Sequence, residues 1–385
     1  MKFVENVNSS LILTQMIFFI FGVWTPKFTG WKKRLFPFYS FAILSIYTII
    51  QVGDLIQVWG DLPLMTATTF LLFSNFVVVT KLVNTIWRQE EIREMMREAH
   101  DELSSETQGT GRAIVKSCNS ETRKQLSLFF ALSYMTVFLW AASAEKNELP
   151  FRAWYPFDTS KSPAYQLAYA HQIIAVLLEA TINICLDTLV TSVICQCRCR
   201  LRLLALTLRT LSDGLEVTNT GLLTFSSNRI VNDRLNRCVM RHQAVLVQVN
   251  LLQKYFSLQV LAQFTLSMMI ICVTAYQLAF EATSLVRIFS MLFYLVVMML
   301  QVFLYCYQGN QLVLDSEGVL SAGYEGPWYT YSIPTRRSLL VLMTRTRSES
   351  RLKAGGLAEL SLRTFMSIIK ASYTFYTVLQ QVVED

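Results

Sequence analysis

The sequence predicts an all-α membrane protein with seven transmembrane helices, a cytoplasmic N-terminus and an extracellular C-terminus. The chain has 385 residues, of which 53% are hydrophobic and 16% are charged, whereas an ordinary soluble domain is about 25% charged. Apolar runs long enough to cross a bilayer recur along the chain, and basic residues gather in alternate connections between them. No internal repeat divides the sequence, so we expect one membrane domain over residues 1–385.

Seven apolar runs approach or exceed the roughly 20 residues that a helix needs to span the hydrocarbon core. They cover residues 37–58, 64–86, 126–144, 165–194, 255–280, 285–307 and 357–383. An eighth run, residues 11–24, is shorter and stops before Pro26, which predicts a re-entrant or interfacial segment.

The positions of Lys and Arg predict the orientation. Of the 34 basic residues, 27 lie in the N-terminal segment and in the connections after the second, fourth and sixth runs, and 4 lie in the opposite connections. The positive-inside rule therefore places the N-terminus in the cytoplasm and the C-terminus outside, the inverse of a G-protein-coupled receptor. The net charge of +7 follows from this distribution and does not call for a nucleic-acid partner.

The segments expected in the cytoplasm are long and helical. Residues 88–103 carry Glu and Arg at helical spacing, residues 195–211 continue the fourth run, and residues 229–254 lead into the fifth. These segments predict a helical bundle beneath the membrane. The outer connections are short except for residues 145–164, whose prolines and aromatic residues suit a roof over a pocket.

The eight cysteines avoid the outer connections, so no extracellular disulfide is expected. Cys195, Cys197 and Cys199 lack a second Cys or His pair of matching spacing, which argues against a metal site. Palmitoylated thiols at the membrane edge and simple inert cysteines remain open, and the second is favoured.

The fourth run holds His171, Glu179, Asn183 and Asp187 on one helical face. Ionisable groups inside a span are costly and usually face a cavity or a partner. Lys81 in the second run lies at roughly the depth of Asp187, and we favour a structural ion pair between them over a ligand role. Glu179 and His171 lie nearer the outside and are better candidates for lining a solvated vestibule.

Aromatic residues crowd the outer halves of several runs, where most are expected to contact lipid or pack in the core. A pocket among them would be apolar and would suit a small volatile or lipophilic ligand. Enzyme signatures such as HExxH, a nucleotide-binding glycine loop or G-x-S-x-G are missing from the sequence, and the three histidines are far apart. We therefore expect neither catalysis nor a cofactor.

The last run carries a small and polar stripe that a lipid-facing helix would not use. Spacing alone leaves two readings evenly open: a helix-packing face or one wall of an ion pathway. The stripe consists of Thr364, Ser367, Ala371, Thr374, Val378, Gln381 and Asp385.

From the sixth run onward the chain resembles the insect odorant receptors. The resemblance covers about 80 residues in order, with family-like spacing, and the earlier part of the chain adds topology and loop lengths. The residues that carry it include Tyr305-Cys306-Tyr307-Gln308-Gly309-Asn310, Trp328-Tyr329, Arg337, Arg345, Ala354-Gly355, Lys370 and Ser372-Tyr373.

The resemblance implies a subunit of a heterotetrameric, odorant-gated, non-selective cation channel that assembles with a shared co-receptor. Such a protein would lie in the plasma membrane of olfactory sensory neurons and bind a small volatile organic ligand. The resemblance further implies an anchor domain, here residues 195–254 and 309–370, and a pore helix, here residues 370–385. The chain lacks the long insertion of the co-receptor between spans four and five, which indicates a ligand-tuning subunit.

The family's pore motif falls on residues 374–382. It assigns Val378 and Val382 to a hydrophobic gate, Gln381 to the polar residue exposed as the gate widens, and Thr374 to the pore wall. The Gln380-Gln381 pair departs from the motif, in which an apolar residue can precede the glutamine, so a wetter pore is expected.

The family's odorant pocket lies in the outer half of the membrane among spans two, three, four and six. By depth, the residues expected in the pocket are Phe73, Phe76, Tyr134, Phe138, Leu178 and Tyr294.

The alternatives to an odorant receptor are a gustatory receptor of the same superfamily, against which the 305–310 block argues, and a metabotropic receptor or transporter. A transporter would show inverted repeats, which are missing from the sequence.

Overall fold

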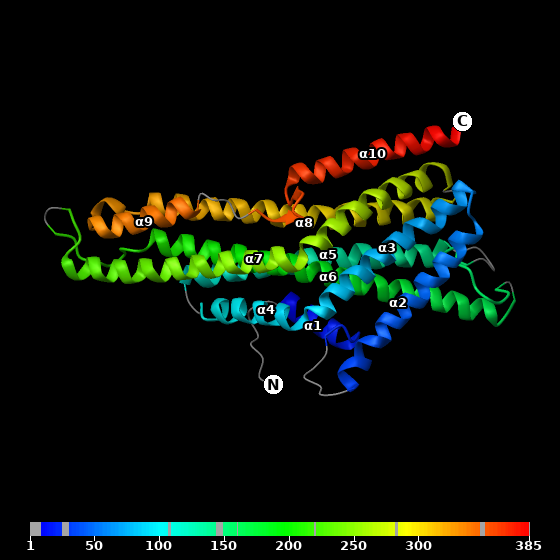
Figure 1. Ribbon diagram of the computed structural model, residues 1–385, viewed down its shortest axis with the longest axis horizontal. Helices are drawn as coiled ribbons and strands as arrows, with labels where there is room; N and C mark the ends of the chain where they lie inside the picture. The colour runs from blue at the N-terminus through cyan, green and yellow to red at the C-terminus, as the bar shows by residue number, and fades with distance from the viewer. Residues whose placement is uncertain are drawn as a thin grey trace.

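The computed structural model describes residues 9–24, 31–106, 109–143, 149–159, 161–218, 221–281, 284–346 and 351–384. These residues are almost entirely helical, with one small β-hairpin (Figure 1). The helices are α1 (Ser9–Ile20), α2 (Trp31–Gln57), α3 (Leu62–Trp87), α4 (Gln89–Ser104), α5 (Gly109–Ser143), α6 (Ala164–Arg209), α7 (Phe225–Tyr276), α8 (Leu285–Glu325), α9 (Ile333–Thr346) and α10 (Leu362–Glu384). A π-helical turn, η1 (Gln277–Glu281), extends α7, a 3₁₀ turn, η2 (Trp328–Thr330), follows α8, and the hairpin pairs β1 (Lys353–Ala354) with β2 (Ala358–Glu359).

Three helices form the long axis of the molecule. α6, α7 and α8 contain 46, 52 and 41 residues, so at about 1.5 Å per residue each is roughly 60–80 Å long, twice the roughly 30 Å of the hydrocarbon core. They run side by side, and α9 packs along α8 at one end of the bundle, which we call the distal end (Figure 1). The predicted helical continuation of the fourth and fifth runs is confirmed, since residues 195–209 belong to α6 and residues 229–254 to α7.

Within the described ranges, seven helices have 23 or more residues: α2, α3, α5, α6, α7, α8 and α10. Five of them, α3 and α5 to α8, are both long and apolar enough to cross a membrane. The short α1 packs against α5 and α6 through the buried Phe18, while Met16 and Ile20 stay exposed. Such a two-sided helix agrees with the interfacial segment expected for this part of the chain.

The start of the last helix differs from the prediction. The sequence reads as one apolar run from residue 357, but β1 and β2 occupy residues 353–359 and α10 begins at Leu362. Gly355 and Gly356 turn the hairpin with φ of 58° and 75°, which favours glycine. The Gly355 N–H donates to the Ser257 carbonyl oxygen of α7 (2.9 Å), which holds the hairpin against that helix.

All eight cysteines are unpaired and buried, Cys195, Cys197 and Cys199 among them. α6 is enclosed by neighbouring helices over most of its length, so these three thiols face protein and not the membrane surface. This burial favours inert cysteines over palmitoylated ones.

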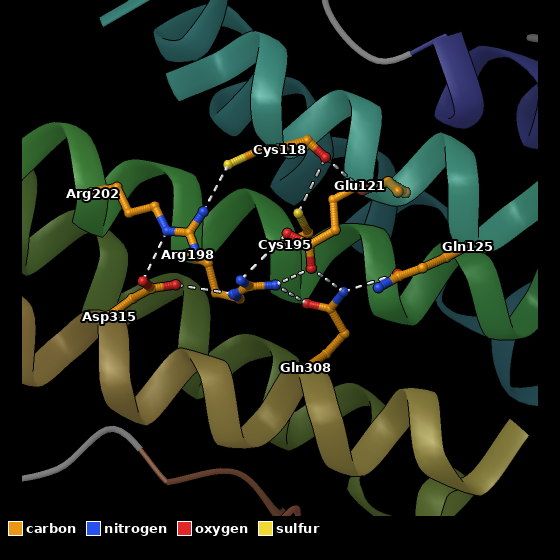
Figure 2. Close-up of polar contacts among 9 residues, drawn as sticks. Cys118, Glu121, Gln125, Cys195, Arg198, Arg202, Gln308 and Asp315 are labelled. Carbon is orange, nitrogen blue, oxygen red and sulfur yellow. Dashed lines mark hydrogen bonds and ion pairs between the residues drawn. The ribbon is translucent and has the colours of Figure 1, made fainter. Parts of the chain in front are cut away.

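A buried arginine joins three helices toward the distal end (Figure 2). The guanidinium of Arg198 on α6, 1% exposed, donates to Glu121 on α5 (2.7 Å) and to Gln308 (2.6 Å) and Asp315 (3.0 Å) on α8. Arg202, one helical turn further along α6, donates to the other Asp315 oxygen at 2.8 Å. Because the planar guanidinium has several fixed donors, one side chain can satisfy acceptors from two helices at once.

Candidate functional site

A cavity lies among α3, α5, α6 and α8, the four helices that correspond to runs two, three, four and six. Its volume is about 50 Å³, several times the roughly 10–15 Å³ that one water needs. It is lined by Leu71, Ser74, Phe129, Ser133, Thr136, Val137, Trp140, Val176, Glu179, Ala180, Asn183, Ile184, Tyr294, Val297 and Met298.

An aromatic cluster forms one wall of this cavity. The rings of Trp140 and Tyr294 lie 5.0 Å apart, and Phe70 packs edge-on against Tyr294 at 5.5 Å. Phe151, from the outer connection between α5 and α6, packs at 90° on Trp140 (4.9 Å). The Gln172 side chain fixes the Phe151 backbone with two hydrogen bonds, of 2.9 and 3.3 Å. The connection therefore covers the aromatic end of the cavity.

Two polar groups stand out in this lining. Glu179 on α6 is 4% exposed and lines the cavity together with Ser74 of α3. The buried hydroxyl of Tyr294 on α8 has no hydrogen-bond partner among the described residues. Among the described residues that line the cavity, none is Lys, Arg or His. The arrangement can therefore bind the polar end of a ligand while the rings and aliphatic side chains enclose the rest.

The predicted ion pair between Lys81 and Asp187 is present. The Lys81 ammonium lies 2.5 Å from Asp187 and donates to Asn183 at 2.9 Å. The Tyr305 hydroxyl (2.8 Å) and the Gln301 amide also donate to Asp187. Since Asn183 lines the cavity as well, this network joins α3, α6 and α8 at its edge.

His171 is not part of the cavity. Its Nδ1 lies 3.0 Å from the Tyr155 hydroxyl in the outer connection, and Tyr47 packs edge-on against its ring at 6.2 Å. Burial raises the pKa of Tyr155 to about 12, so this hydroxyl stays protonated at neutral pH. The structure thus places His171 and Glu179 in different surroundings on the same helix.

The residues expected in the pocket from their depth lie in several different environments. Tyr294 lines the cavity. Phe73 and Leu178 are half-buried beside it, outside the lining. Tyr134 lies with its hydroxyl 3.0 Å from Thr181, at the interface of α5 and α6.

Phe76 and Phe138 point away from the cavity and are 57% and 68% exposed. Consecutive residues on a helix point about 100° apart, so Val137 lines the cavity while its neighbour Phe138 faces outward. Depth in the membrane fixes the height of a residue and not its direction. The signal that could have found the wall is the series Phe129, Ser133, Thr136, Val137 and Trp140, at the spacing of one helical face.

The terminal helix α10 lies along the outside of the bundle, against α7 and α8 (Figure 1). Its inner side includes the buried Ile368 and Ser372, and Phe365 packs edge-on against Phe303 of α8 at 5.6 Å. The side chains of Thr374, Val378 and Gln381, spaced by four and three residues, are exposed on α10. The Val382 side chain lies outside the described residues.

A bundle of long apolar helices that encloses a cavity and carries a peripheral terminal helix is typical of a multi-pass helical membrane protein. The family model described as "7tm Odorant receptor" matches residues 62–373. The chain therefore belongs to the insect odorant receptor family, as its terminal motifs predicted, and not to the gustatory branch.

Several relatives cover most of the chain. Odorant receptor Or1 of Anopheles gambiae is 22% identical over 94% of this chain and 93% of its own length. Odorant receptor 94a of Drosophila melanogaster is 28% identical over 62% of this chain and 59% of its own length. The structure of the olfactory receptor OR5 from Machilis hrabei superposes with a TM-score of 0.79 over 97% of both chains, at 17% identity. This likeness confirms the predicted all-α, seven-helix fold.

Proposed function

We propose that the chain is a ligand-tuning subunit of an odorant-gated, non-selective cation channel that assembles with the shared co-receptor as a heterotetramer. The observation that carries the proposal is the exposed face of α10. Thr374, Val378 and Gln381 lie on it while the opposite side of the helix packs on α7 and α8. The Thr374 hydroxyl donates to the Lys370 carbonyl oxygen (3.1 Å), but lipid offers no partner to the Gln381 amide. This face therefore suits a water-filled axis shared between subunits.

The cavity among α3, α5, α6 and α8 is the proposed odorant site. Tyr294, Val297 and Met298 of α8 line it, and further along α8 Phe303 contacts Phe365 of α10. A ligand that binds one arrangement of α8 more tightly would therefore shift α10 toward the position that goes with that arrangement. Val378, with Val382, would close the pore by dewetting, and Gln381 would line it when open. That a structure of Machilis hrabei OR5 is a complex with eugenol supports a small organic ligand here.

The proposed setting is the plasma membrane of olfactory sensory neurons, with the N-terminus in the cytoplasm and the C-terminus outside. The distribution of basic residues supports this orientation. The distal ends of α6, α7 and α8 would then form, with α9, the hairpin and the start of α10, an anchor domain beneath the membrane.

The test is whole-cell recording from cells that express the chain with the co-receptor. We expect ligand-evoked cation current that persists when G-protein signalling is blocked. Val378→Ser should raise the ligand-independent leak, because a polar ring wets the constriction. Met366→Ser, which is also exposed but lies before Lys370, is the control and should leave the leak unchanged. Current abolished by G-protein blockade would indicate a metabotropic receptor, and an unchanged leak in Val378→Ser would remove Val378 from the gate.

A further inference from the structure

The cavity contains an acidic group, Glu179, that forms no ion pair with any residue the structure describes. Glu179 is buried in the lining, which it shares with the neutral Ser74. Lys81, the basic residue of the neighbouring network, contacts Asn183 and Asp187. An ionised carboxylate is costly to bury unless a positive charge pairs with it. In this cavity that charge can come from a ligand.

Aromatic rings surround the same space. Phe129, Trp140 and Tyr294 line the cavity together with Glu179. The faces of such rings attract cations, and the attraction is stronger where water is excluded. The Tyr294 hydroxyl, which has no hydrogen-bond partner in the part of the chain that the structure describes, offers an acceptor as well. A carboxylate, a free acceptor and several rings are the groups that recognise an ammonium ion.

We propose that this cavity binds small primary amines as ammonium ions, paired with Glu179 and enclosed by the rings of Trp140 and Tyr294. The inference rests on the proposed function, because it assumes that the cavity is the ligand site. The cavity volume is about 50 Å³. At roughly 10–15 Å³ per water, this is room for roughly four waters. It suits an alkylamine of about five non-hydrogen atoms.

Two compounds of equal size separate charge from shape. Butylamine and butan-1-ol each have a four-carbon chain and one polar head. The amine is protonated at neutral pH, as a lysine side chain is, whereas the alcohol is a neutral hydrogen-bonding group. If Glu179 were protonated, it would donate and accept hydrogen bonds with either compound and would not prefer the amine.

The experiment compares concentration–response curves for both compounds in cells that express the chain with the co-receptor. The wild type should respond to butylamine at concentrations about tenfold to a hundredfold below those of butan-1-ol, the range of a hydrogen bond to a charged group. Glu179→Gln, which keeps the size and removes the charge, should abolish most of this preference, and Glu179→Asp should retain part of it.

Asp54→Asn is the matched control. Asp54 is also a buried carboxylate, 6% exposed, but it binds Thr68 and Arg152 outside the cavity lining. The preference for the amine should survive this change. Equal responses of the wild type to both compounds, or an undiminished preference in Glu179→Gln, would overturn the proposal.

Thermal stabilisation of the purified complex by the same two compounds separates this inference from the channel function. Stabilisation by butylamine that depends on Glu179, without current from either compound, would support the amine site and contradict gating. Current from butan-1-ol without amine preference would support the channel and contradict the amine site.

Discussion

Two charged residues within the spans are explained by the groups around them. Asp187 accepts hydrogen bonds from Lys81, Gln301 and Tyr305, and Lys81 also donates to Asn183. A buried pair with this many hydrogen bonds is compensated, whereas either charge left alone would not be. The sequence predicted the pair because the two opposite charges lie at one depth.

Asp187→Asn should destabilise the protein by about 3–5 kcal/mol, because it leaves the Lys81 ammonium buried without a counterion. The double variant Lys81→Met/Asp187→Leu should recover much of this loss, since no charge remains. Thermal unfolding of the purified protein in detergent measures both effects. An Asp187→Asn variant as stable as the wild type would show that the pair contributes nothing to the fold.

Gly309 is required by a close approach between α8 and the segment that follows the hairpin. A Cβ atom at this position would overlap the side chain and the carbonyl oxygen of Leu360. This glycine belongs to the 305–310 block that carries the family resemblance, so part of that motif has a steric cause.

Gly309→Ala should therefore lower the unfolding temperature and the amount of protein at the cell surface. Gly318→Ala is the control on the same helix, because nothing lies within 4 Å of a Cβ added there. That change should be neutral or stabilise α8 by up to about 1 kcal/mol, since Ala favours a helix over Gly. Equal behaviour of the two variants would contradict the steric argument.

At the scale of elements, the packing of α5, α6 and α8 depends on the hydrogen bonds and ion pairs of the buried Arg198. Arg198→Lys should cost about 2–3 kcal/mol, because one ammonium cannot reach Glu121, Gln308 and Asp315 together, and buried acceptors are left unsatisfied. The same substitution at Arg209, half exposed and paired with Glu325, should cost under about 1 kcal/mol. Thermal unfolding of the two variants measures both losses of stability. Equal losses would show that the interactions at position 198 do not require an arginine.

The sequence predicted the long helices but not which side of each helix faces the cavity. The helical continuation beyond the fourth run was predictable, because the apolar residues of residues 195–211 keep helical spacing without a Gly or Pro. Phe76 and Phe138 were placed by depth alone, and their outward direction depends on how α3 and α5 rotate against α6. The hairpin before α10 was missed because Leu357, Ala358 and Glu359 were counted with the apolar run that follows. The Gly355-Gly356 pair is the signal that could have marked the turn.

At the scale of the whole molecule, α8 lines the proposed ligand site and also contacts the proposed pore helix. The cavity reaches Met298 on α8, and five residues further Phe303 contacts Phe365 of α10. A shift of α8 on ligand binding would thus be transmitted to α10 through one continuous helix. In the proposed heterotetramer, the exposed face of α10 would become an inner surface around the common axis, which would account for its exposure in a single chain.

The most direct test of this account is chemical modification of Val378→Cys in the complex with the co-receptor. A positively charged thiol reagent, added during ligand-evoked current, should reduce that current, because Val378 faces the open pore. Ser372→Cys, whose position is buried on the packed side of α10, should be unaffected, as should the wild type, whose eight cysteines are all buried. Unchanged current in Val378→Cys, with modification verified by mass, would contradict the assignment of α10 to the pore wall.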